Sequence, residues 1–236
     1  MGAGPSLLHI RMLGRNPAEP HRASSPLELL FDLTFVVAVS SLAGQLADGI
    51  DRGHTADAIG PYFQVFFAIW WAWMNFTWFA SAFDTDDALY RIFTLVQMAG
   101  VLVLAAGVPA AVGHGDYLAI TLGYVIMRVA LVAQWLRAGI EHRASRGVAA
   151  RYAIGVLLVQ GGWVLRLLVV PASWGTVSFV VLAVAELVVP VWAEWKVRTS
   201  WHPGHIAERY ALFVIILLGE SVAAATVAMQ AALAAT

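Results

Sequence analysis

Four ionisable residues lie inside long apolar stretches of the sequence, where a charge is costly. Arg128 and Glu186 fall near the middle of their stretches, and Arg166 and Glu220 fall in the outer parts of theirs. A charge at the centre of a bilayer costs about 2.5–3.5 kcal/mol or more, so each residue needs a partner or a wet cavity. Matching by depth predicts the ion pairs Arg128–Glu186 and Arg166–Glu220. Such pairs either fix helix packing or form a polar pathway for an ion or solute.

The segment "PLELLFDLTF" carries two carboxylates one helical turn apart, Glu28 and Asp32. Glu28 follows Ser25 by three positions, which is the spacing of a capping box with proline at the first helical position. Asp32 lies one turn further in, where its own helix has no free amide to offer. We therefore expect Asp32 to pair with Arg91 or Arg209, or to contact water.

A second segment, "WWAWMNFTWF", places an amide between indoles on one helical face. Asn75 has Trp71 four residues before it and Trp78 three residues after it. These three residues are typical of an aromatic pocket for a cation or a lipid headgroup. They are also typical of bulky packing with an interfacial tryptophan anchor, which is the interpretation we favour.

Two further polar groups occur at segment ends. The acidic run "DTDD" precedes an apolar stretch, and we expect Asp84 or Thr85 to cap the helix that follows. His202, His205 and Glu208 are spaced closely enough to suggest metal ligands, but a Pro-Gly pair interrupts them and no known metal motif fits. We expect no metal site.

The elements that position these residues must be membrane-spanning helices. The chain has 236 residues, of which 60% are hydrophobic and 12% are charged, about half the charge of a soluble domain. Apolar stretches long enough to cross a bilayer recur seven times. Their expected ranges are 27–47, 61–83, 88–112, 117–137, 150–171, 174–194 and 206–229. The prediction is an all-α transmembrane bundle over residues 26–236, preceded by a cytoplasmic segment, residues 1–25.

The positions of Lys and Arg predict the orientation. With the N-terminus in the cytoplasm, one side of the membrane receives nearly all of the basic residues in the connections, and the other receives Arg52 alone. Basic residues concentrate on the cytoplasmic side of membrane proteins. This asymmetry also supports the count of about seven spans, since a missed helix would scramble it.

Several classes of function are disfavoured. The formal net charge of −1 gives no support for nucleic-acid binding, and the absence of cysteine excludes disulfides and thiolate chemistry. The sequence contains no glycine-rich phosphate loop, G-x-S-x-G elbow or H-E-x-x-H helix. We expect no catalytic residues and no cofactor, and an enzyme is the less favoured class.

The combined motifs resemble the bacterial low temperature requirement A (LtrA) family. The matching stretches are "PLELLFDLTFVVAVSSLA", "NFTWFASAFDTDDALYRIFTLVQMAGVLVLAAGVPAA", "YVIMRVALVAQWLR", "ELVVP" and "HIAERYALFVIILLGES". The resemblance implies a multi-pass protein of the bacterial cytoplasmic (inner) membrane, connected with low-temperature growth and stress adaptation. It implies no particular reaction or substrate. The polar signature that it carries over comprises Glu28, Asp32, Asp84, Arg91, Arg128, Glu186, His205, Glu208, Arg209 and Glu220.

Two hypotheses about function follow. The first is a transporter or ion-conducting bundle that moves a small ion or solute through a polar pathway. Its residues would be Asp32, Arg91, Arg128, Arg166, Glu186, Glu208, Arg209 and Glu220. The alternative is a non-transporting membrane scaffold or lipid-interacting stress protein in which the same charges are structural. Membrane lipids are expected partners under both hypotheses, and both are compatible with a homo-oligomer.

Overall fold

A computed structural model describes residues 8–20 and 22–234, and within these residues all regular secondary structure is helical. The long helices are α1 (Pro26–Asp51), α2 (Thr55–Phe83), α3 (Ala88–His114), α4 (Leu118–Glu141), α5 (Arg146–Val169), α6 (Gly175–Ala193) and α7 (Pro203–Ala234). Two short 3₁₀ helices, η1 (Arg143–Ser145) and η2 (Ala172–Trp174), lie in the α4–α5 and α5–α6 connections.

Local sequence signals account for several helix ends. The predicted capping box is present at α1, where the Ser25 side chain accepts from the Glu28 amide and the Glu28 carboxylate accepts from the Ser25 amide. The N-cap of α3 is Asp87, which corrects the expectation of Asp84 or Thr85. Gly115 ends α3 in the left-handed conformation, at φ 70°, which glycine adopts without strain.

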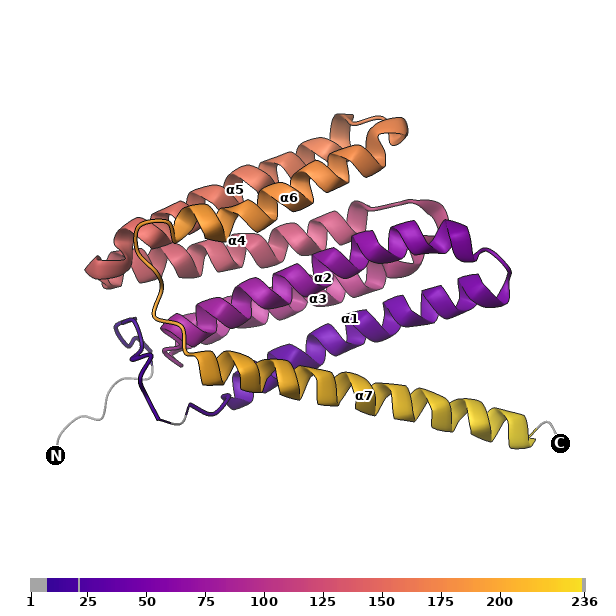
Figure 1. Ribbon diagram of the computed structural model, residues 1–236, viewed down its shortest axis with the longest axis horizontal. Helices are drawn as coiled ribbons and strands as arrows, with labels where there is room; N and C mark the ends of the chain where they lie inside the picture. The colour runs from indigo at the N-terminus through magenta and orange to yellow at the C-terminus, as the bar shows by residue number, and fades with distance from the viewer. Residues whose placement is uncertain (1–7, 21, 235–236) are drawn as a thin grey trace.

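The long helices pack side by side as an up-and-down bundle (Figure 1). Contacts between neighbours run from α6 to α5, α4, α3, α1 and finally α7, while α2 packs against α1, α3, α4 and α7. Consecutive helices joined by short connections are antiparallel, so the ends of α2, α4 and α6 gather at the end of the molecule where α7 begins.

Helices α3 and α4 approach each other closely at two glycines. A Cβ atom on Gly123 would lie 2.4 Å from the carbonyl oxygen of Gly100, and one on Gly100 would lie 2.8 Å from the carbonyl oxygen of Gly123. Small residues at such a crossing let helix backbones approach closely, which favours association inside a membrane. These two glycines set the distance between α3 and α4.

Five helical segments in the described part of the chain are long and apolar enough to cross a membrane. They comprise α1, α3, α4, Arg143–Val169 and Ala172–Ala193. The helices extend beyond several of the expected ranges: α2, for example, begins at Thr55 and contains Pro61, where the sequence predicted a start. The tryptophan-rich α2 is not among the five.

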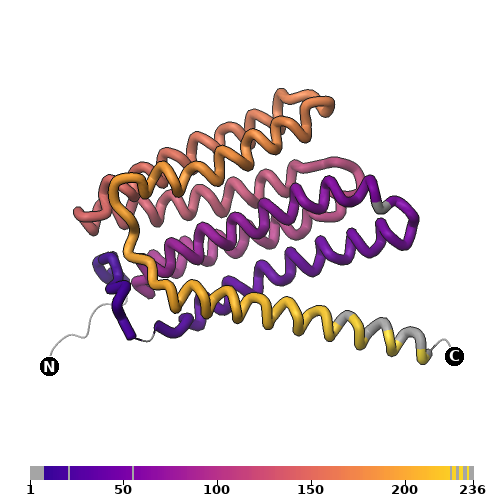
Figure 2. The backbone as a smooth tube through the Cα atoms, in the orientation of Figure 1, coloured from indigo at the N-terminus to yellow at the C-terminus, as the bar shows by residue number. Residues whose placement is uncertain are grey.

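The last helix departs from the bundle. A connection, residues 194–202, descends from α6 along the end of the molecule, passing near the N-terminal segment before α7 begins (Figure 2). From there α7 runs beside α1, and Val214, Ile215, Leu218 and Val222 are exposed. Its packed residues are concentrated near its start.

Candidate functional site

A buried ion pair joins α4 and α6 about midway along each helix. Nη2 of Arg128 lies 3.3 Å from Oε2 of Glu186, and each side chain is 1% exposed. This is the pair that the matching of depths predicted. A charge pair removed from water is stable only when hydrogen bonds satisfy its remaining groups.

Three aromatic side chains supply those hydrogen bonds to Glu186. Tyr124 of α4 donates to Oε1 at 2.9 Å, and Trp163 of α5 donates to the same oxygen at 3.2 Å. Trp71 of α2 donates to Oε2 at 3.0 Å. Arg128, Glu186, Tyr124, Trp163 and Trp71, called here the central cluster, therefore connect four helices through one carboxylate.

Arg128 is less completely satisfied than its partner. Its Nη2 donates to the hydroxyl oxygen of Tyr124, and its guanidinium lies 4.6 Å from the centre of the Tyr124 ring. Its Nε and Nη1 groups are buried without a hydrogen-bond partner among the described residues. Unmade hydrogen bonds to a buried charge are costly, so the guanidinium retains capacity for another acceptor.

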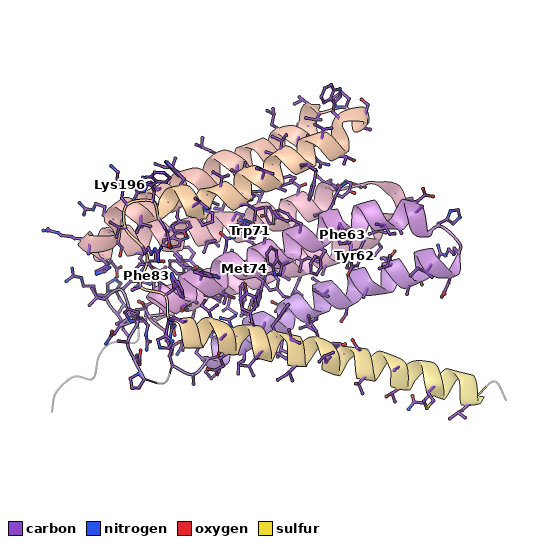
Figure 3. The ribbon with its side chains drawn as sticks, viewed as in Figure 1. Tyr62, Phe63, Trp71, Met74, Phe83 and Lys196 are labelled. Carbon is purple, nitrogen blue, oxygen red and sulfur yellow. The ribbon has the colours of Figure 1, made fainter. Side chains whose placement is uncertain are left out.

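A cavity lies on one side of the central cluster, towards the end of the molecule where α7 begins. This inner cavity has a volume of about 370 Å³ and is bounded by α2, α4, α5, α6 and the α6–α7 connection. Figure 3 labels Trp71 and Met74, which line it midway along α2. The residues that line it are Trp71, Met74, Asn75, Trp78, Trp135, Tyr152, Pro190, Val191, Glu194, Arg198, Thr199 and Trp201.

Two cavities lie on the opposite side of the cluster, between the other halves of the same helices. A narrow one of about 30 Å³ is lined by Tyr124 and Trp163 of the central cluster and by Arg166. A wider one of about 420 Å³, the outer cavity, shares Gln64, Tyr117 and Arg166 with the narrow one. Trp71 lines the inner cavity and Tyr124 and Trp163 line the narrow one. All three donate to the Glu186 carboxylate, which itself lines neither cavity.

A second buried polar group joins α1 to α7. The guanidinium of Arg209 binds both carboxylate oxygens of Asp32, with Nε 3.0 Å from Oδ2 and Nη2 on Oδ1. Trp73 of α2 also donates to Asp32, at 2.6 Å. Glu28 contacts Nη1 of Arg209 at 3.3 Å and Nε2 of His205 at 3.2 Å. These residues form the α1–α7 cluster.

Arg22 connects the α1–α7 cluster to the α2–α3 connection. Its guanidinium lies 3.9 Å from Glu28 and 3.8 Å from Asp84, and it donates to backbone carbonyls at the end of α2. Burial, followed by the negative charge of Glu28, raises the pKa of Asp84 to about 6. Burial lowers the pKa of Arg22 from its ordinary value.

A third group, the α3–α4 cluster, binds the N-terminal segment. Arg137 contacts both oxygens of Asp87, at 2.8 and 2.5 Å, and Glu141 at 2.9 Å. Arg137 also donates to the carbonyl of Ile10, whose amide donates to Asp87 at 2.8 Å. The amide of Met12 donates to Glu141. Residues 9–12 therefore lie against the ends of α3 and α4.

Comparison with known proteins decides the family. The model of the "Bacterial low temperature requirement A protein (LtrA)" family matches residues 23–236. The chain belongs to the LtrA family. The resemblance drawn from the motifs is thus confirmed. Together with its five apolar helices, this family membership makes the chain a membrane protein.

A relative supports this assignment. The LtrA-family chain is 31% identical over 225 residues to an uncharacterized protein of Rhizobium meliloti (strain 1021), an alignment that covers 91% of this chain and 53% of that protein. The chain thus spans about half the length of this curated relative. No solved structure matches this LtrA-family chain.

The second predicted ion pair of the LtrA-family chain does not form. Arg166 donates to the hydroxyl of Ser178 at 3.2 Å and to the carbonyl of Gly175 at 3.0 Å, which closes the α5–α6 connection. Glu220 lies exposed on α7. Similar depth does not make helices neighbours, and α5 and α7 lie at opposite edges of the bundle (Figure 1).

Other predicted residues of the family signature lie apart from the central cluster. Arg91 is exposed and pairs with Asp86 at 2.8 Å, so Arg209 is the partner of Asp32. Glu208 is half-buried and accepts from the amide of Ser24 at 3.4 Å. The predicted set therefore divides among separate clusters and the surface.

The histidines at the start of α7 have separate structural partners. His202 Nδ1 accepts from the amide of His205, its Nε2 lies 2.7 Å from the carbonyl oxygen of Glu19, and His205 Nε2 contacts Glu28. Within the described residues, no group of three His, Asp or Glu side chains is arranged to hold a metal ion.

Sequence reasoning missed two features of this LtrA-family chain. Arg137 lies at the end of an expected span, where basic residues usually contact lipid headgroups, although Glu141 four residues later indicated a helical ion pair. Glu194 was not singled out either. It lines the inner cavity together with Trp71, Asn75 and Trp78, the three residues that the sequence grouped as a pocket.

Proposed function

We propose that this LtrA-family protein is a transporter or ion-conducting bundle that moves a small ion or solute between α2, α4, α5 and α6. One observation carries the proposal: Trp71 lines the inner cavity, Tyr124 and Trp163 line the narrow one in the other halves of the same four helices, and all three donate to the Glu186 carboxylate. Ionisable residues inside a membrane usually face the interior of the bundle or a water-filled cavity, and they mark ion and solute pathways. Glu186 is the residue that a permeating species must pass.

In this proposal, the inner and outer cavities open on opposite sides of the membrane. All seven long helices cross the bacterial cytoplasmic membrane, including the tryptophan-rich α2 and the peripheral α7. The N-terminal segment lies in the cytoplasm, as the distribution of basic residues favours. The inner cavity then opens towards the cytoplasm, and the outer cavity, which contains Arg166, opens towards the opposite side.

The central cluster acts as the closed barrier in this arrangement. Its carboxylate is held by donors from both sides, namely Trp71 next to the inner cavity and Tyr124 and Trp163 next to the narrow one. If Trp71 released Glu186, the carboxylate would be exposed to the inner cavity while Tyr124 and Trp163 still bound it. If Tyr124 and Trp163 released it, the carboxylate would be exposed to the narrow cavity while Trp71 still bound it. Alternating release is the general requirement for transport, in which gates on the two sides open in turn.

The experiment is a flux measurement on purified protein in proteoliposomes, with H⁺, Na⁺, K⁺ and choline as test cations. Wild-type protein should move at least one of them. Glu186→Gln keeps the shape of the side chain but removes its charge, so it should abolish that flux. Asp57→Asn, which neutralises an exposed carboxylate in the first turn of α2, should leave it unchanged. Absence of all four fluxes, or full flux in Glu186→Gln, would count against the proposal.

The scaffold alternative is favoured by the complete set of hydrogen bonds around Glu186, which is what a static ion pair requires. In that case, replacing Arg128 and Glu186 together by apolar residues should recover the stability lost by either replacement alone. Normal growth in the cold by cells with the double variant would then favour the scaffold.

A further inference from the structure

Five of the twelve residues that line the inner cavity are aromatic. Trp71 and Trp78 come from α2, Trp135 from α4, Tyr152 from α5 and Trp201 from the α6–α7 connection. Trp135 and Tyr152 are stacked with their ring centres 4.1 Å apart, and Trp78 and Trp201 lie 4.7 Å apart. Aromatic rings attract cations through their negative faces, and groups of such rings bind methylated ammonium ions.

The carboxylate of Glu194 lines this cavity, and no cationic side chain among the described residues pairs with it. Glu194 accepts hydrogen bonds from the hydroxyls of Tyr152, at 3.0 Å, and Thr199, at 2.6 Å. Both hydroxyls donate to Oε1, which leaves Oε2 open to a further donor. Across the described residues, no Arg, Lys or His forms a salt bridge with Glu194, whereas the buried carboxylates of Asp32 and Glu186 are each paired with an arginine.

The other polar groups around the cavity are compatible with a cationic ligand. Asn75 donates its amide N–H to the backbone oxygen of Trp71, so its own carbonyl oxygen is available as an acceptor. Arg198 also lines the cavity but is exposed. Its charge is therefore screened by solvent far more than a buried charge would be.

From these contacts we infer that the inner cavity binds an alkylammonium group, with Glu194 as counter-ion and the tryptophans as its cage. The volume of about 370 Å³ lies within the range of small-molecule sites, about 300–1,000 Å³. The ammonium is carried either by a free organic cation or by a lipid headgroup. The inference names a substrate class for the proposed transporter and rests on that function only for the step beyond binding.

Trp71 links this site to the central cluster. The same indole lines the inner cavity and donates to Oε2 of Glu186. An ammonium group that binds against Trp71 would draw the indole away from Glu186. It would thereby weaken the hydrogen bond that holds the carboxylate on the side of the inner cavity. Occupancy of the cavity is thereby connected to release of the ion pair.

Binding is tested on full-length protein in detergent by titration calorimetry with choline. The control ligand is 3,3-dimethylbutan-1-ol, which has the same shape but no charge. Choline should bind and the alcohol should not. Glu194→Gln should weaken choline binding by about tenfold or more, and Trp201→Leu by about threefold to tenfold, because each removes one attraction for the cation. Asp57→Asn, which changes an exposed carboxylate in the first turn of α2, is the carboxylate control and should bind as wild type does.

Thermal unfolding of each variant in the same detergent shows whether it is folded. Equal binding of choline and the neutral alcohol would overturn the inference, as would unchanged choline binding in a folded Glu194→Gln variant. A second arm adds micelles that contain phosphatidylcholine or phosphatidylglycerol as competitors. Displacement of choline by phosphatidylcholine alone identifies a lipid headgroup as the source, and no displacement identifies a free cation.

The two proposals fail separately. Choline binding that depends on Glu194, without flux in proteoliposomes, keeps the ammonium site and removes the transporter. Flux that depends on Glu186, in a protein that does not bind choline, keeps the transporter and removes the ammonium site.

Discussion

Asp84 and Asp87 lie at two ends of one short connection, yet arginines from different parts of the chain hold them. Asp84 faces Arg22 at 3.8 Å, whereas Asp87 receives two hydrogen bonds from Arg137. Burial favours the protonated form of both carboxyl groups and so tends to raise both pKa values. At Asp87 the hydrogen bonds from Arg137 and from the amides of Ile10 and Tyr90 outweigh it and bring the pKa to about 2, while at Asp84 burial prevails and the pKa rises to about 6.

The raised pKa of Asp84 predicts that stability falls as pH rises. Between the ordinary value of 3.8 and about 6, the folded protein keeps the proton that the unfolded chain has lost, so the free energy of unfolding decreases with pH. Asp84→Asn removes this cost. At pH 7 it should stabilise the protein by about 1–3 kcal/mol. Unfolding in mixed micelles across this pH window measures the difference, and a less stable Asn variant would contradict the prediction.

The lowered pKa of Asp87 predicts the opposite pH dependence. Its contribution is complete above the ordinary value of 3.8 and is lost as pH falls towards about 2. Asp87→Asn leaves Arg137 buried without its main partner and removes a charged helix cap, so it should destabilise the protein at pH 7 by about 3 kcal/mol. The same unfolding experiment compares the two Asn variants, and equal effects would show that the surroundings of the two carboxylates do not differ as described.

The crossing of α3 and α4 predicts a strong effect of one methyl group. Gly123→Ala places a Cβ atom 2.4 Å from the carbonyl oxygen of Gly100, so the two backbones must separate. We expect a loss of about 1–3 kcal/mol. Gly161→Ala in α5 is the matched control, because a Cβ atom there has no neighbour within 4 Å, and its stability should be unchanged or slightly higher. Thermal unfolding of both variants in one detergent gives the comparison.

The N-terminal segment should detach when Arg137 is replaced. Arg137→Met removes the donor to the carbonyl of Ile10 and leaves Asp87 and Glu141 without their shared cation. Trypsin should then cut after Arg11 or Arg15 several times faster than in wild type, since cleavage requires a detached, extended segment. Arg91→Met, which changes an exposed arginine, serves as the control. An unchanged cleavage rate in Arg137→Met would mean that other contacts hold the segment.

The helices could be predicted because apolar length and basic connections are properties of the sequence itself. The Arg128–Glu186 pair could be predicted because two central charges of opposite sign had few alternatives. The Arg166–Glu220 pair failed because depth along a helix gives no information about lateral neighbours. The docking of residues 9–12 had no periodic signal, since its contacts use backbone groups that any residue carries.

The Asp32–Arg209 pair has a consequence for how the chain enters the membrane. The two residues are separated by 177 positions, so during synthesis α1 is complete long before its basic partner emerges. Until α7 has been made, the indole of Trp73 is the partner that the described residues offer to Asp32, and α1 carries an acid without its arginine. The pairing of Asp32 in α1 is therefore completed only once α7 has been made. Mutations in α7 should appear in cells as failures of assembly that begin at α1.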